Sequence, residues 1–448
     1  MLNIKLISEK EALNISNKES LFLVEIEGVK NKIKSNKKSQ RLNLSLVIDI
    51  SGSMNGQVAP VDLSNYVANR NNYLMGGVGF NIETQCKKST SKLSLTKKAA
   101  ISAIEKMNVG DFISLVVFDD SVDVLFESQE ITEKNRKKII KEISKLNTRG
   151  GTDLHKGWLT GATEVAKTMK EDFINRVIVL SDGVTYSGIV DPLEICKNVG
   201  LLNKKGVSTT TIGIGSDFNE DLLQNMSSSG GGNFYYVKDI KDFDDVFNQE
   251  FTGLLNVSGS EIGLGFDFDS GFEVLEQLNQ IELKDGTYNV SDISGGKKVS
   301  LLFKIKTPIK KDFDIKTKID VGTLVLTYKD NTGKKVKEEI KIEMPVLKNK
   351  KWSDLEFNKE IKVQDMLLEI ANEKLKSGDL ASSGNIDGAK DILRGVSALT
   401  ISAGIEDDRL TDSLKTLEDS IKMADEMNSG DFKKTMMYAT YRSRTSKD

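Results

Sequence analysis

The sequence predicts an α/β protein in which a doubly wound, mostly parallel sheet is inserted in or flanked by a β-sandwich-like domain and followed by C-terminal helices. Three observations support this fold class. Residues 42–255 alternate short apolar runs with helical patterns, which indicates a parallel sheet covered on both faces. After residue 255 the apolar residues recur with a period of two, and from residue 352 the period is helical again.

The α/β segment contains six apolar runs that we expect to be strands. They lie at residues 44–50, 112–118, 122–126, 177–180, 207–214 and 234–237. Helical patterns lie at residues 93–107, 132–146, 154–169, 192–204, 219–227 and 240–255. Only three residues separate the second run from the third, and a parallel crossover needs about a dozen, so these two runs should form an antiparallel hairpin at the sheet edge.

The first residues of the chain resemble the segment that follows the α/β region. Phe22, Val24 and Ile26 alternate with polar residues, as the apolar residues do from residue 256 onward. We therefore expect residues 1–41 to supply N-terminal strands that pack with an antiparallel β domain at residues 256–349. The α/β domain at residues 42–255 would then be an insertion, which close termini make tolerable.

Residues 350–448 show apolar stripes with helical spacing, which predicts a small C-terminal helical region. Gly378 and the run Asn428-Ser-Gly430 are expected to interrupt these helices, because glycine favours helix ends.

Composition excludes several classes of function. The chain has 448 residues and a net charge of −3, with 63 basic and 66 acidic residues interspersed, so its charge gives no reason to expect nucleic acid or membrane as a partner. No apolar run approaches the roughly 20 residues of a transmembrane helix, and the first residues lack the apolar core of a signal peptide. With only two cysteines, a disulfide framework is not expected, and we expect a cytoplasmic protein.

A single histidine, His155, excludes His-based triads and multi-His metal sites. Its position near the start of an expected helix predicts a surface residue. Asp119 and Asp120 end one expected strand and could approach a ligand site at that end of the sheet, but we interpret them as turn residues before the hairpin.

Oxygen side chains gather where the expected strands end or the helices begin. Asp49, Ser51 and Ser53 follow the first strand of the α/β segment, Thr152 precedes a helix, and Asp182 follows another strand. Ligand sites in open α/β sheets lie at the carboxyl ends of the strands, and oxygen donors suit a hard divalent cation. We therefore expect one metal site. The three hydroxyls would be direct ligands, and the two carboxylates would act through hydroxyls or bound water.

Such a site would leave the cation strongly electrophilic, because its direct ligands are neutral. An open coordination position would then attract an anionic oxygen, most naturally a carboxylate of a partner. Each segment alone also fits a simpler interpretation: a polar loop at residues 49–53, a turn and helix cap at residues 150–153, and a turn at residues 182–183. Their joint occurrence in one α/β unit favours the metal site.

The order Asp49-x-Ser51-x-Ser53, then Thr152, then Asp182 resembles the metal-ion-dependent adhesion site of von Willebrand factor type A (VWA) domains. The surrounding sequence is similar too, over residues 46–54, 150–154, 179–183 and 211–215. The resemblance covers residues 42–255, about half of the chain, and is to bacterial stand-alone members of the family.

This resemblance implies a doubly wound fold, a protein partner, and Mg²⁺ as the usual ion, with Mn²⁺ and Ca²⁺ left open. It also implies a protein that is not an enzyme, and since some bacterial members work beside AAA+ ATPases, it implies such a partner here. In some relatives, ligand binding displaces the last helix of the domain, here residues 240–255. The chain departs from the family pattern in a long insertion at residues 55–92, beside the expected metal, where a binding role and a simple surface excursion are both open.

Two other functions stay open at this point. One is a Mg²⁺-dependent hydrolase of phosphate esters with Asp49 as nucleophile or base, but haloacid-type phosphotransferases need a second acid two residues later, where this chain has Ser51. The other is a scaffold whose metal is purely structural.

Overall fold

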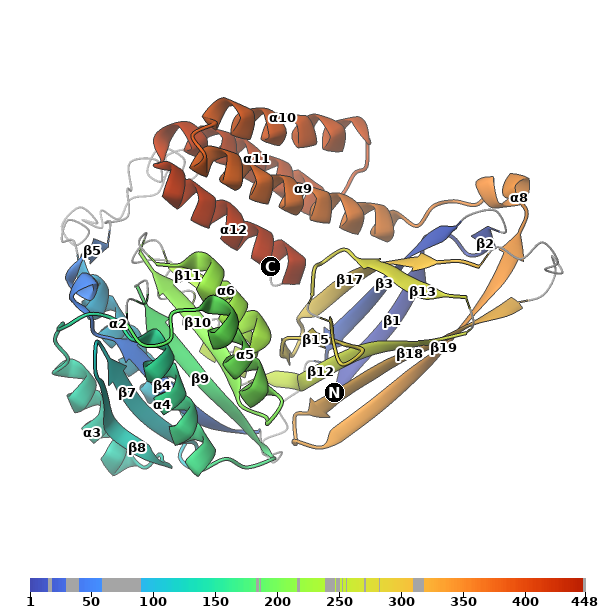
Figure 1. Cartoon of the computed structure of the whole chain (residues 1–448). Coiled ribbons are helices and arrows are strands. Elements are labelled where there is room, and N and C mark those ends of the chain that lie inside the picture. Colours follow the sequence, from blue (N-terminus) through green and yellow to red (C-terminus); the bar gives the residue numbers. More distant parts are fainter. Residues whose placement is uncertain are drawn as a thin grey trace, which may run out of the picture. The chain divides into compact units, whose positions relative to one another are not determined.

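The computed structural model of the chain is shown in Figure 1. It describes residues 1–14, 18–29, 40–58, 90–182, 185, 187–215, 218–237, 246, 250–251, 253–254, 256–269, 271–281, 283–308 and 318–445. The chain folds as two compact units, one formed by Met1–Ser39 with Asn256–Asp448 and the other by Gln40–Leu255. Within the described ranges, no helix combines the length and the apolar character that crossing a membrane requires.

The Gln40–Leu255 unit is built on a sheet whose described strands run in the order β11-β10-β9-β4-β7-β8. Their bounds are Arg41–Asp49 (β4), Phe112–Phe118 (β7), Val122–Glu130 (β8), Phe173–Ser181 (β9), Ser208–Ile214 (β10) and Gly231–Val237 (β11). Neighbouring strands are parallel except β7 and β8, which form an antiparallel hairpin at one edge. The predicted strands and the predicted fold class, a doubly wound mostly parallel sheet, are confirmed.

Helices cover this sheet, and their first residues follow polar caps. The described helices are Lys92–Lys106 (α2), Glu133–Ser144 (α3), Leu154–Lys167 (α4), Pro192–Asn203 (α5) and Glu220–Ser229 (α6). Each one follows a Ser, Thr, Asp or Asn whose side chain accepts a hydrogen bond from the first turn, which satisfies an amide that has no partner within the helix. Helix α4 packs on the central strands β4, β7 and β9, so β4 and β9 are buried almost throughout.

Two predicted features of this unit lie largely outside the described residues. A short antiparallel ribbon joins β5 (Gln57–Val58) to β6 (Thr90–Ser91), and residues 59–89 of the expected insertion are not described. Of the helix expected at residues 240–255, the described residues 246, 250, 251, 253 and 254 are helical.

The described part of the other unit contains two β-sheets. The first has the order β1-β3-β17-β13, with bounds Leu2–Ser8 (β1), Glu19–Gly28 (β3), Lys298–Lys306 (β17) and Glu273–Gln277 (β13). The second has the order β14-β15-β12-β18-β19-β2, with bounds Leu283–Lys284 (β14), Thr287–Val290 (β15), Val257–Phe268 (β12), Lys318–Asp330 (β18), Lys335–Leu347 (β19) and Leu13–Asn14 (β2), and a short strand β16 (Ile293–Ser294) beside β12. Because β3 pairs with β17, strands from before and after the α/β unit share one sheet.

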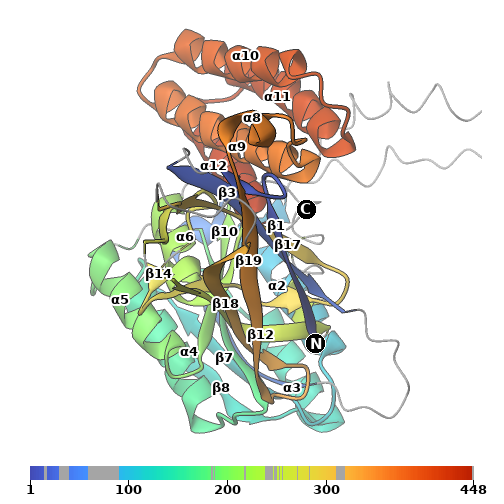
Figure 2. The same ribbon diagram turned by 90° about the vertical axis from the view of Figure 1, so that its right-hand side faces the viewer.

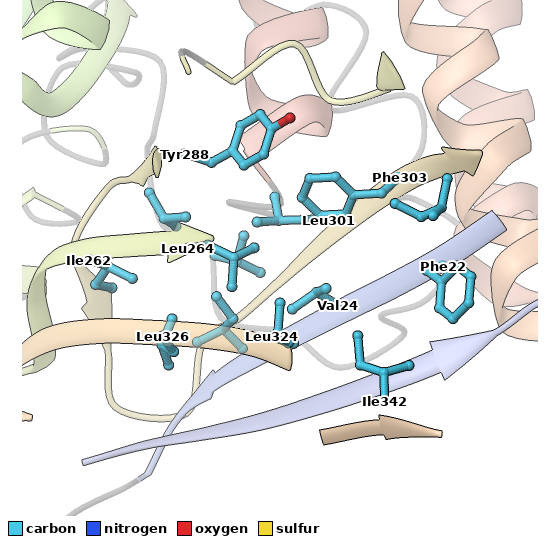
Figure 3. Packing of buried hydrophobic residues seen from close by; sticks show 14 of the residues in the cluster. Phe22, Val24, Ile262, Leu264, Tyr288, Leu301, Phe303, Leu324, Leu326 and Ile342 are labelled. Carbon is cyan, nitrogen blue, oxygen red and sulfur yellow. The ribbon is translucent and has the colours of Figure 1, made fainter. Parts of the chain in front are cut away.

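Alternating apolar residues from both sheets form one core (Figure 3). Val24 pairs with Leu301 across β3 and β17, and both side chains are fully buried among residues such as Leu264 and Leu324 of the facing sheet. Burying each such side chain contributes about 1.5–3 kcal/mol, so this core accounts for the sandwich-like arrangement.

The C-terminal region consists of α8 (Asn349–Ser353), α9 (Lys359–Ser382), α10 (Ile386–Ser402), α11 (Asp408–Glu426) and α12 (Ser429–Thr445), as Figure 2 shows. These helices share a core that includes Leu393, Leu417 and Phe432. Helix α9 also packs on β3 and β17, where Ile361 and Leu368 join Leu23 and Leu302 in a second small core.

One expected helix break is wrong. Gly378 lies inside α9 and is buried, and a Cβ at this position would lie 3.2 Å from the Cα of Lys433 in α12. The missing side chain therefore permits close contact between two helices. The other expected break is confirmed, because α11 ends before Asn428, whose Oδ1 accepts from the Asp431 amide in the first turn of α12.

Candidate metal centre

Asp49 is the last residue of the buried strand β4, and its side chain is fully enclosed. Its Oδ1 accepts from the Ser51 amide at 2.8 Å, and its Oδ2 accepts from the Ser181 hydroxyl at 2.6 Å. Burial raises the pKa of the Asp49 carboxyl to about 6, although these hydrogen bonds oppose the shift. The carboxylate is thus tied to the start of the next loop and to the end of β9.

The chain turns at once after Asp49 into a short 3₁₀ helix, η1 (Gly52–Asn55). This turn places the Ser51 and Ser53 hydroxyl oxygens 3.0 Å apart. The Ser53 hydroxyl donates to Oδ1 of Asp182 at 2.8 Å, although 129 positions separate the two residues. Ser53 is exposed whereas Ser51 and Asp182 are buried, so the cluster opens to the surface at Ser53.

Thr152 lies on a neighbouring loop that hydrogen bonds hold beside this turn. The Gly52 amide donates to the Gly150 carbonyl at 3.1 Å, and the Arg149 amide donates to the Ile50 carbonyl at 2.7 Å. Thr152 itself is 3% exposed. The structure therefore joins Asp49, Ser51, Ser53 and Asp182 through direct hydrogen bonds and brings Thr152 next to them through its backbone.

Asp119 and Asp120 hold the loop that carries Thr152. Oδ2 of Asp120 accepts from the Gly151 amide at 2.7 Å, and the Asp119 carbonyl accepts from the Asp153 amide at 2.8 Å. Oδ1 of Asp119 also accepts from the Ser121 amide and hydroxyl, so the predicted turn before the hairpin is present. These residues thus form the predicted turn and also hold the loop of Thr152, whereas the interpretation from sequence favoured the turn alone.

Lys92, the first residue of α2, is a member of the site that the sequence did not reveal. Its Nζ lies 2.7 Å from Oδ2 of Asp182, and the side chains of the two residues are 6% and 0% exposed. Asp182 therefore uses one oxygen for Ser53 and the other for a buried ammonium. No local sequence pattern could relate Lys92 to Asp182, because the two residues are 90 positions apart.

The predicted surface position of His155 is wrong. The residue is 7% exposed, its Nε2 lies 3.2 Å from Nδ2 of Asn198 in α5, and its ring packs 5.7 Å from the ring of Trp158. Burial lowers the pKa of the imidazole. The contact with Asn198 joins distant segments, which the local sequence does not show.

The donor set fits a hard divalent cation. Ser51, Ser53 and Thr152 offer hydroxyl oxygens, and the carboxyl of Asp49 is buried with a raised pKa that a nearby cation would counteract. Among the described residues, no group of three or more His, Cys, Asp or Glu side chains could hold a metal by itself. Transition-metal chemistry based on nitrogen and sulfur ligands has no support in this donor set.

Comparison with known proteins agrees with this arrangement. Residues 87–249 match the family model of the von Willebrand factor type A domain. The chain contains a VWA domain. The matched range includes Thr152 and Asp182, whereas Asp49, Ser51 and Ser53 precede it.

The chain is also similar to a curated bacterial protein. It is 28% identical over 217 residues to the uncharacterized protein sll0103 of Synechocystis, an alignment that covers 48% of this chain and 42% of that protein. The chain thus matches less than half of the length of this relative.

Two solved structures share the fold over nearly the whole chain. A von Willebrand factor type A protein from Catenulispora acidiphila has a TM-score of 0.69 at 17% identity, covering 94% of this chain and 88% of that one. The ArnB paralog VWA2 from Sulfolobus acidocaldarius has a TM-score of 0.57 at 15% identity, covering 99% and 98%. At these identities the similarity concerns the fold alone, and it extends beyond the VWA domain to the flanking regions.

Proposed function

We propose that this VWA domain binds a carboxylate of a protein partner through a divalent cation at the Asp49–Ser53 turn. The observation that carries the proposal is the bonding of the two aspartates. All four of their carboxylate oxygens accept a hydrogen bond from the protein, from the Ser51 amide, Ser181, Ser53 and Lys92. The carboxylates are thus engaged as orienting groups, and the hydroxyls of buried Ser51 and exposed Ser53 remain as oxygen ligands for a cation.

The hydrogen bond from Ser53 to Asp182 sets the direction of the hydroxyl. Because the proton points to the carboxylate, the oxygen lone pairs are directed away from it; one faces the Ser51 hydroxyl at 3.0 Å, and the other is available to a cation. Ser51, Ser53 and Thr152 would hold the ion directly, and Asp49 and Asp182 would act through hydroxyls or bound water. When bound, the ion supplies a positive charge with an open coordination position for an anionic oxygen.

VWA domains in general are metal-dependent modules of protein interaction, which agrees with this proposal. Mg²⁺ is the ion we propose first, with Mn²⁺ or Ca²⁺ as alternatives. An AAA+ ATPase as the partner and a cytoplasmic location remain predictions from the sequence.

Affinity capture with the full-length chain tests the proposal. Wild type, Asp49→Ala and Asp172→Ala are used as baits in Mg²⁺ and in EDTA, with captured proteins identified by mass spectrometry. Asp172 is an exposed residue before β9 and serves as the matched control. We expect a partner that wild type and Asp172→Ala retain in Mg²⁺ and that EDTA and Asp49→Ala both release. A partner that survives both treatments would contradict the proposal.

Two further measurements test the alternatives of a structural metal and a hydrolase. A metal that changes thermal stability but changes no captured protein would indicate a structural metal. Turnover of generic phosphate esters that depends on Mg²⁺ and on Asp49 would indicate a hydrolase.

A further inference from the structure

Lys92 is a buried cation built into the candidate site. Its ammonium and the Asp182 carboxylate form an ion pair of 2.7 Å in which neither side chain is more than 6% exposed. Burying a lysine this deeply costs free energy unless the charge has a close partner, so the pairing is a built feature of the site. A neutral donor could have satisfied the same carboxylate oxygen.

The surrounding backbone makes room for this side chain. Gly215 has a φ of +79°, and a Cβ there would lie 2.6 Å from Cε of Lys92. The Lys92 amide donates to the Gly56 carbonyl at 2.9 Å, which fixes the start of α2 beside the turn that carries Ser53. The lysine thus reaches Asp182 by a path that the loop after β10 leaves open, and it contacts the oxygen that Ser53 does not use.

This pairing changes the charge of the site. Asp49, Asp182 and Lys92 together carry a formal charge of −1, which a divalent cation would change to +1. Without Lys92 the same loaded site would be neutral. A site without the Lys92 charge would hold the cation more tightly. With the cation bound, however, it would be neutral and would attract an anionic group less strongly.

We propose that Lys92 sets the charge of the metal site, so that it weakens cation binding and strengthens binding of an anionic partner group. Lys92 is a positioning and charge-setting residue and is not a metal ligand. The inference rests on the proposed metal site and adds to it the reason why the loaded site should select an anion.

The test compares wild type with Lys92→Met, Lys92→Gln and Lys98→Met at pH 8. Methionine keeps most of the length without charge, and glutamine keeps a donor for Asp182 without charge. Lys98 lies on the exposed side of α2 and controls for the loss of one positive charge from the same helix. Cation affinity is measured by calorimetric titration with Mg²⁺. Anion affinity is measured by the broadening of the acetate proton signal in the presence of Mn²⁺-loaded protein.

We expect both Lys92 variants to bind Mg²⁺ about tenfold more tightly than wild type and to bind acetate several-fold more weakly, with Lys98→Met unchanged. Equal Mg²⁺ and acetate affinities in all four proteins would overturn the inference but leave the metal site standing. Absence of Mg²⁺ binding in all four would instead refute the proposed function.

Folding of the variants is checked by circular dichroism with and without Mg²⁺. Under the proposal, the two Lys92 variants are less stable than wild type without metal and recover in saturating Mg²⁺, because the cation replaces the lost charge beside Asp182. If both variants stay unfolded in saturating Mg²⁺, the ion pair is needed for the fold itself and the inference is wrong.

Discussion

The Ser53 hydroxyl donates to Oδ1 of Asp182 across 2.8 Å and so joins the turn after β4 to the loop after β9. Both loops leave the same edge of the parallel sheet, because β4 and β9 are neighbouring parallel strands. The cluster therefore depends on the strand order, and the strand order depends on the buried apolar runs that precede each loop.

Replacing Asp182 with Asn should weaken Mg²⁺ binding by about 10–100-fold, the usual effect of losing a group that orients a metal ligand. The change removes the charge that orients the Ser53 hydroxyl and leaves the shape of the side chain intact. Calorimetric titration with Mg²⁺ measures the effect, and Asp172→Asn, at an exposed position before the same strand, should bind like wild type. An unchanged affinity in Asp182→Asn would show that this carboxylate plays no part in the site.

Adding a methyl group at Gly151 should weaken Mg²⁺ binding without unfolding the domain. A Cβ at this position would lie 2.2 Å from Oδ1 of Asp120, so this carboxylate must move, which disturbs its hydrogen bond with the Gly151 amide in the loop that carries Thr152. The matched control is Gly395→Ala in α10, where a Cβ would meet no atom within 4 Å. Circular dichroism checks that both variants are folded, and calorimetric titration measures their Mg²⁺ affinity. Wild-type affinity in Gly151→Ala would mean that Thr152 is not a ligand or that its loop tolerates displacement.

Glu250, in the last helix of the VWA domain, is fixed by a buried ion pair. Its Oε1 lies 2.9 Å from Nη1 of Arg176, and both side chains are at most 2% exposed. Thr210, Asn233 and Tyr235 also donate to this carboxylate. Any displacement of this helix, as the family resemblance implies, must separate these groups or carry them along.

Glu250→Gln should lower the free energy of unfolding by about 3–5 kcal/mol at pH 7, since it leaves the buried Arg176 charge unpaired. Burial alone would raise the pKa of Glu250, but the Arg176 charge and the hydrogen bonds outweigh it, and the pKa is lowered from 4.5. A carboxyl group whose pKa is lower in the folded state stabilises the fold at pH values above its unfolded-state pKa. This stabilisation is lost as the pH falls through the folded-state pKa. The difference between variant and wild type should therefore shrink below about pH 4.5.

Urea titrations between pH 3.5 and 7 measure this dependence. Glu142→Gln is the control, because Glu142 pairs with an exposed lysine on the surface of α3 and its loss should change stability little at any pH. A difference that stays constant as the pH falls would contradict the assignment of a charged Glu250.

Much of this structure could be predicted from local sequence. Strands β4, β7, β9 and β10 of the VWA domain are buried almost throughout, and its helices begin after residues such as Thr132 and Asn219 that cap helices wherever they occur. Asp49, Ser51 and Ser53 lie within five positions, so one turn was enough to bring them together. The approach of Asp182 to the Asp49 turn followed from the rule that the carboxyl ends of parallel strands lie at the same end of the sheet.

The features that were missed depend on contacts between distant segments. The ion pair of Lys92 with Asp182 joins residues 90 positions apart. His155 is buried and contacts Asn198 of α5, and Gly378 lies within a helix where the missing side chain lets α12 come close. In each case the residue type fits two environments, and only the tertiary packing decides between them.

The central claim is that a divalent cation binds among the hydroxyls of the Asp49–Ser53 turn. Anomalous diffraction from crystals soaked in Mn²⁺ tests it most directly. The account predicts one strong peak within about 2.5 Å of the hydroxyl oxygens of Ser51, Ser53 and Thr152, the reach of a direct oxygen ligand. A peak elsewhere, or none while these hydroxyls point away from one another, would contradict it.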